Sequence, residues 1–167
     1  MGSPALTVAA RILSTACPNA KTFIAKSKCI PGTAVSVGIA FGPHWPASPA
    51  RPASPTFMEP SDMPSHNELG MCISSYLLHG LAHIELNAVD MYADTLARGL
   101  AFVGEHPQLD ANDFVNDFLS VIADEARHFG LLQHRLQQLG SFYGAMPART
   151  WPVVCCLLVV VSCSNYK

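Results

Sequence analysis

The chain has 167 residues, of which 50% are hydrophobic and 13% are charged, and its formal net charge at pH 7 is -2. This length predicts one domain with a sizeable core. The near-neutral charge argues against a protein that holds nucleic acid or acidic membranes through a basic surface. All twelve acids lie between Glu59 and Glu125, so the segment before Glu59 carries only basic charges.

The segment before Asn67 is predicted to contain little regular structure. Residues 1–30 are expected to form an arm with one short helix, which runs from Leu6 to Ser14 and beyond and is interrupted near Pro18. Residues 31–66 contain eight prolines, a density that rules out a long helix. We therefore predict a proline-rich extended segment that either crosses the domain or lies loose in solvent.

The basic N-terminus and the cysteines bear on the compartment. An acid-free N-terminus is typical of organellar transit peptides, but a basic arm without a targeting role is the simpler interpretation. We expect an intracellular protein in the cytoplasm, with a mitochondrial location as the alternative.

No Cys-x-x-Cys pair or zinc spacing is present, which favours reduced, buried thiols. The six cysteines are Cys17, Cys29, Cys72, Cys155, Cys156 and Cys163.

Two long amphipathic helices are predicted in the middle of the chain. The first runs from about residue 68 to about residue 102, and the second from about residue 113 to residue 139. Asp110 or Asn112 is the expected N-cap of the second helix, and Gly140 is its expected C-terminal stop. Because the loop between the helices is short, we predict an antiparallel hairpin and an all-α fold.

The first helix carries apolar residues on two neighbouring faces, at the steps of three and four that are typical of a helix. One face comprises Ile73, Leu77, Leu81, Ile84, Ala88 and Met91. The other comprises Leu78, Ala82, Glu85, Val89, Tyr92 and Leu96, so that Glu85 stands among apolar residues. A third group, Asp90, Asp94 and Arg98, is predicted to form a charged face in solvent.

One acid likewise interrupts the apolar stripe of the second helix. A buried carboxylate is costly unless a partner neutralises it. His128 follows Glu125 by three residues, a spacing at which two side chains can hold one ion. Glu-x-x-His on an inward face is a ligand arrangement of di-iron carboxylate bundles, so we predict a metal site here. The stripe comprises Phe114, Phe118, Ile122, Glu125, Phe129, Leu132, Leu136 and Leu139.

Glu85 is the third predicted metal ligand, together with Glu125 and His128. If the turn is centred near Gln108, the two acids are offset by about 9 Å along ideal straight helices. A turn centred nearer Glu105 would make them level. A shared site is therefore compatible with the hairpin, and its existence depends on where the helices end.

Other interpretations of these side chains stay open. Arg127 or Arg135 is able to pair with Glu125, which would leave His128 as a polar edge residue. His79 and His83 have a spacing that can hold a metal, but we expect them in solvent or in a supporting role, away from Glu85. The remaining predictions are surface positions for Asp117, Asp124 and His134, and an optional orienting contact from Asp124 to His128. Tyr92 and Tyr143 are expected to pack, and a role near the site stays open for Tyr92, which shares a helix face with Glu85.

Residues 149–167 are predicted to form an irregular apolar tail. The apolar run from Trp151 to Cys163 is shorter than the roughly 20 residues that a membrane-spanning helix needs, so we predict no transmembrane segment. Its β-branched content favours a strand or an aggregation-prone segment.

Two stretches resemble the core helices of an uncharacterised ferritin-like family that is catalogued as a domain of unknown function (DUF455). These stretches are residues 82–90 (AHIELNAVD) and residues 123–132 (ADEARHFGLL), and a weaker similarity extends over the proline-rich segment and residues 10–21. The resemblance implies a ferritin-like four-helix bundle with a di-iron or di-manganese centre. It also implies that Glu85 is the single carboxylate of the first helix, and Glu125 with His128 the Glu-x-x-His pair of the second.

This sequence departs from the family pattern after Pro147 and Ala148, where the resemblance implies a second helical hairpin with the other ligands. Residues 67–148 are therefore expected to be half of a ferritin-like bundle, with the C-terminal half missing and a tail that is not native to the family. Two hairpins paired about a two-fold axis would restore the ligand set. An unpaired hairpin would expose its apolar faces, so we expect self-association.

Three functions compete on this basis. The first is a ferritin-like di-iron (or di-manganese) protein of oxidase or oxygenase type, active as an oxidoreductase if dimerisation completes the bundle. The second is a non-catalytic helical interaction module, and the third is an inactive truncated fragment. The sequence contains no Ser/His/Asp set, phosphate-binding glycine loop or nucleic-acid patch, and it does not identify a substrate.

Overall fold

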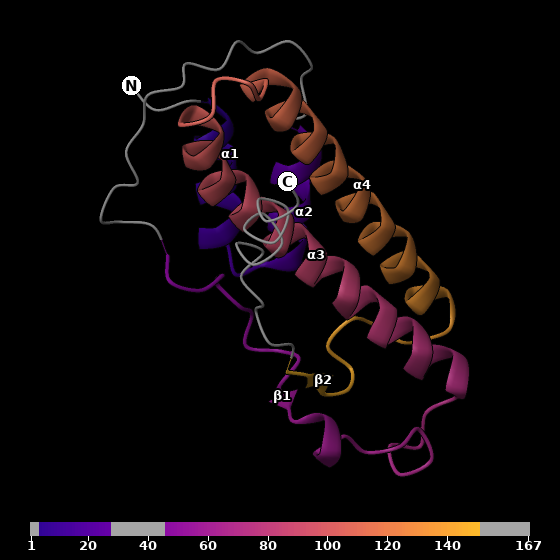
Figure 1. Cartoon of the computed structure of the whole chain (residues 1–167). Helices are drawn as coiled ribbons and strands as arrows, with labels where there is room; N and C mark the ends of the chain where they lie inside the picture. Colours follow the sequence, from indigo (N-terminus) through magenta and orange to yellow (C-terminus); the bar gives the residue numbers. More distant parts are fainter. Residues whose placement is uncertain (1–3, 28–45, 151–167) are drawn as a thin grey trace.

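The fold, given by a computed structural model that describes residues 4–27 and 46–150, is built almost entirely of helices (Figure 1). The predicted all-α class is therefore confirmed. Among the described helices, none combines the length and the hydropathy that a membrane span requires. The elements are α1 (Pro4–Ser14), α2 (Pro18–Ser27), β1 (Phe57–Met58), a 3-10 helix (Pro60–Asp62), α3 (Ile73–Gly104), α4 (Ala111–Gln138) and β2 (Ala148–Arg149).

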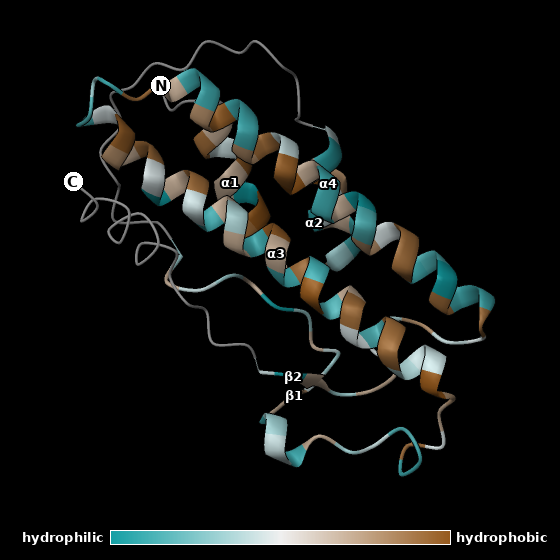
Figure 2. Cartoon of the chain, turned by 45° about the vertical axis from the view of Figure 1, so that its right-hand side comes forward, coloured by the Kyte–Doolittle hydropathy of each residue, from teal (hydrophilic) through white to brown (hydrophobic). Residues whose placement is uncertain are grey.

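The long helices α3 and α4 lie side by side and run in opposite directions, joined by residues 105–110 (Figures 1 and 2). Local signals set both ends of α4. The carboxylate of Asp110 accepts hydrogen bonds from the backbone N–H groups of Asn112 and Asp113, which caps the first turn. Gly140 has a φ of +72° directly after the helix, as a C-terminal stop requires.

The first helix begins later than predicted, at Ile73. The carboxylate of Glu68 accepts hydrogen bonds from the backbone N–H and the hydroxyl of Ser65, and these bonds hold a turn before the helix. Gly70 then adopts a φ of +62°, which interrupts a right-handed helix. The sulfur of Cys72 accepts the N–H of Ser75 and serves as the N-cap of α3.

The N-terminal residues belong to the core, so the prediction of an arm with one short helix is wrong. Pro18 begins α2, at a position where its missing N–H costs nothing. Helix α1 packs on α3 and α2 packs on α4, so the two short helices form a layer behind the hairpin (Figure 1). Ala9, Ile12 and Leu13 of α1 are at most 1% exposed.

The proline-rich segment lies across the domain in its described part, which was one of the two predicted alternatives. The backbone N–H of Ala50 donates to the carbonyl of Leu13 at 2.7 Å. Further along, β1 pairs in parallel with β2, with Phe57 opposite Ala148. The predictions for residues 31–45 and for the apolar tail beyond Thr150 lie outside the described residues.

Only one of the two apolar faces of α3 is buried. Ala82, Val89 and Leu96 are fully buried in the face that meets α1 and α4. The neighbouring face carries large apolar side chains that are exposed to solvent. We call its four most exposed members the α3 apolar row: Ile73, Leu77, Leu81 and Ile84, with exposed fractions between 46% and 57%.

Asp90 is buried, which overturns the prediction that it forms a solvent face with Asp94 and Arg98. Its carboxylate forms ion pairs with the ammonium of Lys21 and, at 3.0 Å, with the guanidinium of Arg51. Lys21 is itself 1% exposed and also donates to the carbonyl of Ala50. Helix α2 and the proline-rich segment cover this side of α3. Asp94 and Arg98, the other two members of this group, are half-buried and form an i, i+4 ion pair at 2.8 Å.

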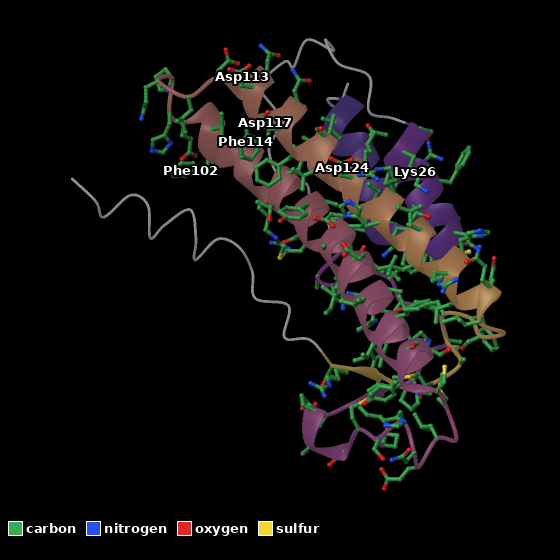
Figure 3. All side chains as sticks on the ribbon, turned by 90° about the vertical axis from the view of Figure 1, so that its right-hand side faces the viewer. Lys26, Phe102, Asp113, Phe114, Asp117 and Asp124 are labelled. Atoms are coloured by element: carbon green, nitrogen blue, oxygen red, sulfur yellow. The ribbon has the colours of Figure 1, made fainter. Side chains whose placement is uncertain are left out.

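The hairpin is packed tightly near its loop. Phe114, in the first turn of α4, projects towards α3 (Figure 3). Its ring lies 4.6 Å from that of Phe118, centroid to centroid. Phe114 and Phe118 of α4 therefore pack against α3 near the loop, where they meet Gly99 and Tyr92.

Candidate metal centre

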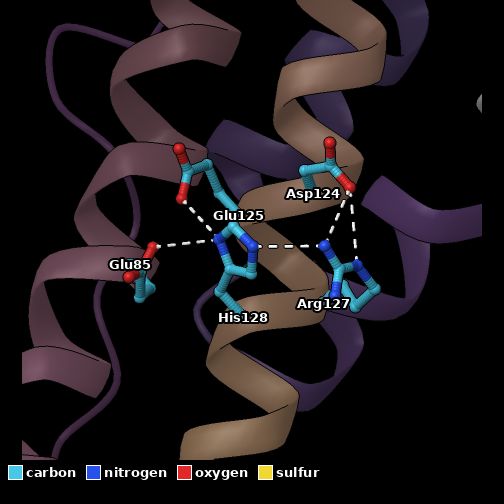
Figure 4. A network of polar contacts seen from close by, with 5 residues as sticks. All are labelled: Glu85, Asp124, Glu125, Arg127 and His128. Carbon is cyan, nitrogen blue, oxygen red and sulfur yellow. Dashed lines mark hydrogen bonds and ion pairs between the residues drawn. The ribbon is translucent and has the colours of Figure 1, made fainter.

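The three predicted ligands meet between the two long helices (Figure 4). Glu85 comes from the middle of α3, and Glu125 and His128 come from successive turns of α4. Nδ1 of His128 lies 3.3 Å from Oε2 of Glu125 and 3.7 Å from Oε2 of Glu85. One potential ligand atom from each residue lies within 4.8 Å of the other two. Two carboxylates and one imidazole therefore converge on a single point.

The observed register places the two acids level, although the turn near Gln108 predicted an offset. Glu85 lies about five helical turns before Gly104, the end of α3, whereas Glu125 lies only about four turns after Ala111, the start of α4. The difference corresponds to about 7.5 Å of helix rise. The loop joins two helix ends that are staggered by this amount. The prediction counted residues from the centre of the loop and therefore assumed helix ends at the same level.

The carboxylates of Glu85 and Glu125 are crowded and half-buried. The interaction with Glu125 and the loss of solvent raise the pKa of Glu85 to about 7, and His128 partly opposes this change. The two carboxylates have oxygen atoms within 4.8 Å of each other, so both cannot ionise without a cost in free energy. A cation placed between them would remove that cost.

No lysine or arginine of the described residues pairs with Glu125, so the alternative pairing with Arg127 or Arg135 is not formed. Arg127 contacts Asp124 at 3.4 Å, and Arg135 donates to Gln138 at 2.9 Å. The guanidinium of Arg127 also lies 3.2 Å from Nε2 of His128, as Figure 4 shows. Arg127 therefore stands where Asp124 was predicted to orient the imidazole.

The contact with Arg127 fixes the tautomer of His128. A guanidinium can only donate, so Nε2 of the imidazole must accept. In the neutral ring the proton then lies on Nδ1, which faces Glu125. A metal ion bound at Nδ1 would take the place of this proton.

His79 and His83 lie on the other side of α3, away from Glu85 as predicted, but they are buried, so the alternative that places them in solvent is wrong. Nε2 of His79 accepts the backbone N–H of Gly144 at 2.8 Å. His83 contacts the carbonyl of Arg149 through Nε2 and the hydroxyl of Tyr143 through Nδ1. Since a carbonyl only accepts, Nε2 of His83 carries the proton and Tyr143 donates to Nδ1. Both imidazoles thus hold residues 143–149 against α3.

Asp117, Asp124 and His134 are exposed, as predicted. Tyr92 packs edge-on against Phe118, and Tyr143 stacks on His79, which agrees with the packing role predicted for both tyrosines. Cys17 and Cys72 are exposed, so the prediction of buried thiols is wrong for these two cysteines; the other four lie outside the described residues.

Comparison with known proteins gives a family without an assigned activity. The model of a family described as "Protein of unknown function (DUF455)" matches residues 14–151. An "Uncharacterized protein" of Haemophilus influenzae (strain ATCC 51907 / DSM 11121 / KW20 / Rd) is 32% identical over 102 residues, which cover 59% of this chain and 34% of that protein. The chain thus spans about a third of the length of this curated relative. No solved structure matches this chain. From the family match, the chain belongs to the DUF455 family.

Proposed function

We propose that this chain binds iron or manganese through Glu85, Glu125 and His128, as part of a ferritin-like di-metal centre of oxidase or oxygenase type. The convergence of three donor side chains from two helices supports this proposal most strongly. Carboxylates and imidazoles suit iron and manganese. A Glu from one helix and Glu-x-x-His from another are also the two elements from which di-iron bundles build their sites.

Asp90 provides a comparison within the same chain for the acids Glu85 and Glu125. Asp90 lies five residues from Glu85 on the same helix, and it is neutralised by Lys21 and Arg51. In the described part of the chain no lysine or arginine performs this task for Glu85 or Glu125. Among the described residues, basic side chains of lysine and arginine neutralise the acid on one side of α3, whereas on the other side the imidazole of His128 is the group that faces Glu85 and Glu125. The oxygen atoms of these two acids would be available for a cation.

The residues around the cluster would hold the imidazole of His128 in one orientation and keep water away from the core side of the site. Arg127 contacts Nε2 of His128, so that Nδ1 faces the two acids. Ile122 and Phe129 flank Glu125 along α4 and are fully buried. Iron or manganese bound by carboxylates and imidazole would supply reactivity towards dioxygen, and these residues would orient the ligands and exclude water from the core side.

Metal binding is tested by loading the full chain with Fe(II) or Mn(II) without oxygen and measuring bound metal after gel filtration. We expect retained metal, and at least a tenfold loss of affinity in Glu125→Ala and in His128→Ala. Asp113→Ala is the matched control, because this acid is exposed on the same helix, about three turns away from the cluster. No retention of metal, or equal losses in Asp113→Ala and Glu125→Ala, would overturn the proposal.

The oxidase or oxygenase assignment needs a separate measurement. Oxygen uptake is followed with an electrode after the Fe(II)-loaded chain is mixed with aerated buffer. We expect uptake in proportion to bound iron, and only the background rate of free Fe(II) in Glu125→Ala. Metal retention without uptake above that background would reduce the function to metal binding.

A further inference from the structure

The α3 apolar row runs along the open side of the metal centre. It covers residues 73–84, a length of about 16 Å on a helix, and it ends at the residue directly before Glu85. The N-terminal helices pack behind the hairpin and do not cover this side (Figure 1). Exposed apolar side chains in a continuous row mark an interaction surface. A partner that covered the row would also close the metal centre.

The neighbouring face of α4 carries charges in a symmetric arrangement. Asp117 and Arg135 lie at equal distances before and after Ala126 in the sequence. The separation between them equals about five turns of an α-helix, so both project from the same face. His128 shares this face, about three turns after Asp117, and both charged side chains are exposed.

This arrangement is complementary to itself. If a second α4 packs antiparallel about a two-fold axis at the level of Ala126, each Asp117 lies opposite Arg135 of the partner subunit. A two-fold interface requires one patch that fits its own copy, and an acid and a base placed symmetrically about the axis meet this requirement. The same axis passes at the level of Glu125 and His128.

The donor set is compatible with the same partner. Within the described residues, the chain brings together one Glu from α3 and one Glu-x-x-His from α4. A di-metal site of the bundle type uses twice this set, with a Glu from each of two helices and Glu-x-x-His from each of two others. Two copies joined about this axis would supply that set.

We propose that two copies of this chain pack about a two-fold axis at the level of Ala126, which covers the α3 apolar row and joins two half-sites into one di-metal centre. The joined centre rests on the proposed function, whereas the interface itself does not. The partner is a second copy because the charges on α4 complement one another under two-fold symmetry.

Sedimentation of the full chain tests the interface, first without metal and then with Mn(II). We expect a dimer that Mn(II) tightens, with two ions per dimer. Leu81→Glu places a charge in the apolar row at a side chain that is 47% exposed, and it should raise the dimer dissociation constant at least tenfold. Phe23→Glu on α2, where the native side chain is 70% exposed, is the control and should leave the dimer intact. Circular dichroism shows whether each variant remains helical.

A charge exchange tests the predicted symmetry. Asp117→Arg alone and Arg135→Asp alone should each weaken the dimer about tenfold, because each opposes like charges across the axis. The double variant Asp117→Arg/Arg135→Asp should restore the native dissociation constant to within a few fold. Failure of this restoration, or equal effects of Leu81→Glu and Phe23→Glu, would overturn the proposed interface.

Different results would overturn the proposed dimer and the proposed metal binding. A chain that stays monomeric with bound Mn(II) overturns the dimer and leaves metal binding intact. A dimer that Leu81→Glu dissociates, but that retains no metal, supports the interface and overturns the proposed function.

Discussion

Gly99 of α3 faces the ring of Phe114 of α4 so closely that a methyl group at Gly99 would lie 2.6 Å from Cζ of that ring. The ring of Phe114 also packs against that of Phe118. This glycine therefore permits the close approach of the two long helices near their loop.

Gly99→Ala should lower the free energy of unfolding by about 1 kcal/mol, because the cost of overpacking exceeds the gain in helix propensity. Gly80→Ala is the matched control on the same helix, since a methyl group there meets no atom within 4 Å. It should raise the free energy of unfolding by about 0.5–1 kcal/mol. Urea denaturation measures both, and an effect of the same sign in the two variants would contradict the packing described here.

Asp90→Asn should destabilise the fold by about 3 kcal/mol, because it leaves the ammonium of Lys21 buried without its counter-charge. The double variant Lys21→Met/Asp90→Leu removes both charges, while Arg51, which is 25% exposed, can turn to solvent. It should recover more than half of the lost stability in the same denaturation experiment. A double variant that is less stable than Asp90→Asn would show that the pair stabilises the fold beyond mutual neutralisation.

Acid should weaken the fold through His79. Burial, with a smaller effect of His83, lowers the pKa of His79 from 6.5 to about 4. The unfolded chain therefore binds a proton at a higher pH than the folded chain, and stability is lost as the pH falls from about 6.5 to about 4. The loss should amount to about 2 kcal/mol once solvent screening is included. Its structural cause is that a protonated Nε2 cannot accept the N–H of Gly144.

His79→Gln isolates this effect from the other titrating groups, notably Glu85, whose raised pKa acts in the opposite direction as the pH falls. The variant should be less stable at pH 7 but should lose less between pH 6.5 and pH 4.5. Denaturation midpoints across this range provide the comparison. Parallel curves for the two proteins would exclude His79 as the source.

Glu85→Gln should affect the metal-free and the metal-loaded protein in opposite directions. Without metal at pH 8, the change removes one of two crowded carboxylates and should raise the free energy of unfolding by about 1 kcal/mol. With Mn(II) at about a hundred times its dissociation constant, the native chain should gain about 2.7 kcal/mol, and the variant should gain far less. Thermal melts with and without chelator test this, and a simple loss of stability in both states would instead indicate a structural role for Glu85.

The hairpin and its candidate ligands were predictable because their signals are local. Asp110 and Gly140 mark the ends of α4 through capping interactions with their own neighbours. Glu125 and His128 are three residues apart on one helix, and each acid stands out against an apolar stripe. A helical period was sufficient to select them.

The predictions that were wrong concern residues that contact distant parts of the chain. Asp90 has the sequence environment of a surface acid, and only Lys21, 69 residues away, and Arg51 make it a buried one. His79 is buried because Gly144 returns to it from 65 residues away. The two apolar faces of α3 are equally regular, so the choice of the buried face depended on where α1 packs. No single-helix pattern contains that information.

The pairing of β1 with β2 imposes an order on folding during synthesis. Phe57 leaves the ribosome long before Ala148, its partner. At about 5–20 residues per second, the interval between them corresponds to a wait of roughly 5–20 seconds. Helix α3 is itself completed about halfway through that interval, and His79 and His83 have then not yet been contacted by Gly144 and Arg149. The nascent chain therefore presents these imidazoles to its surroundings until the last described residues arrive.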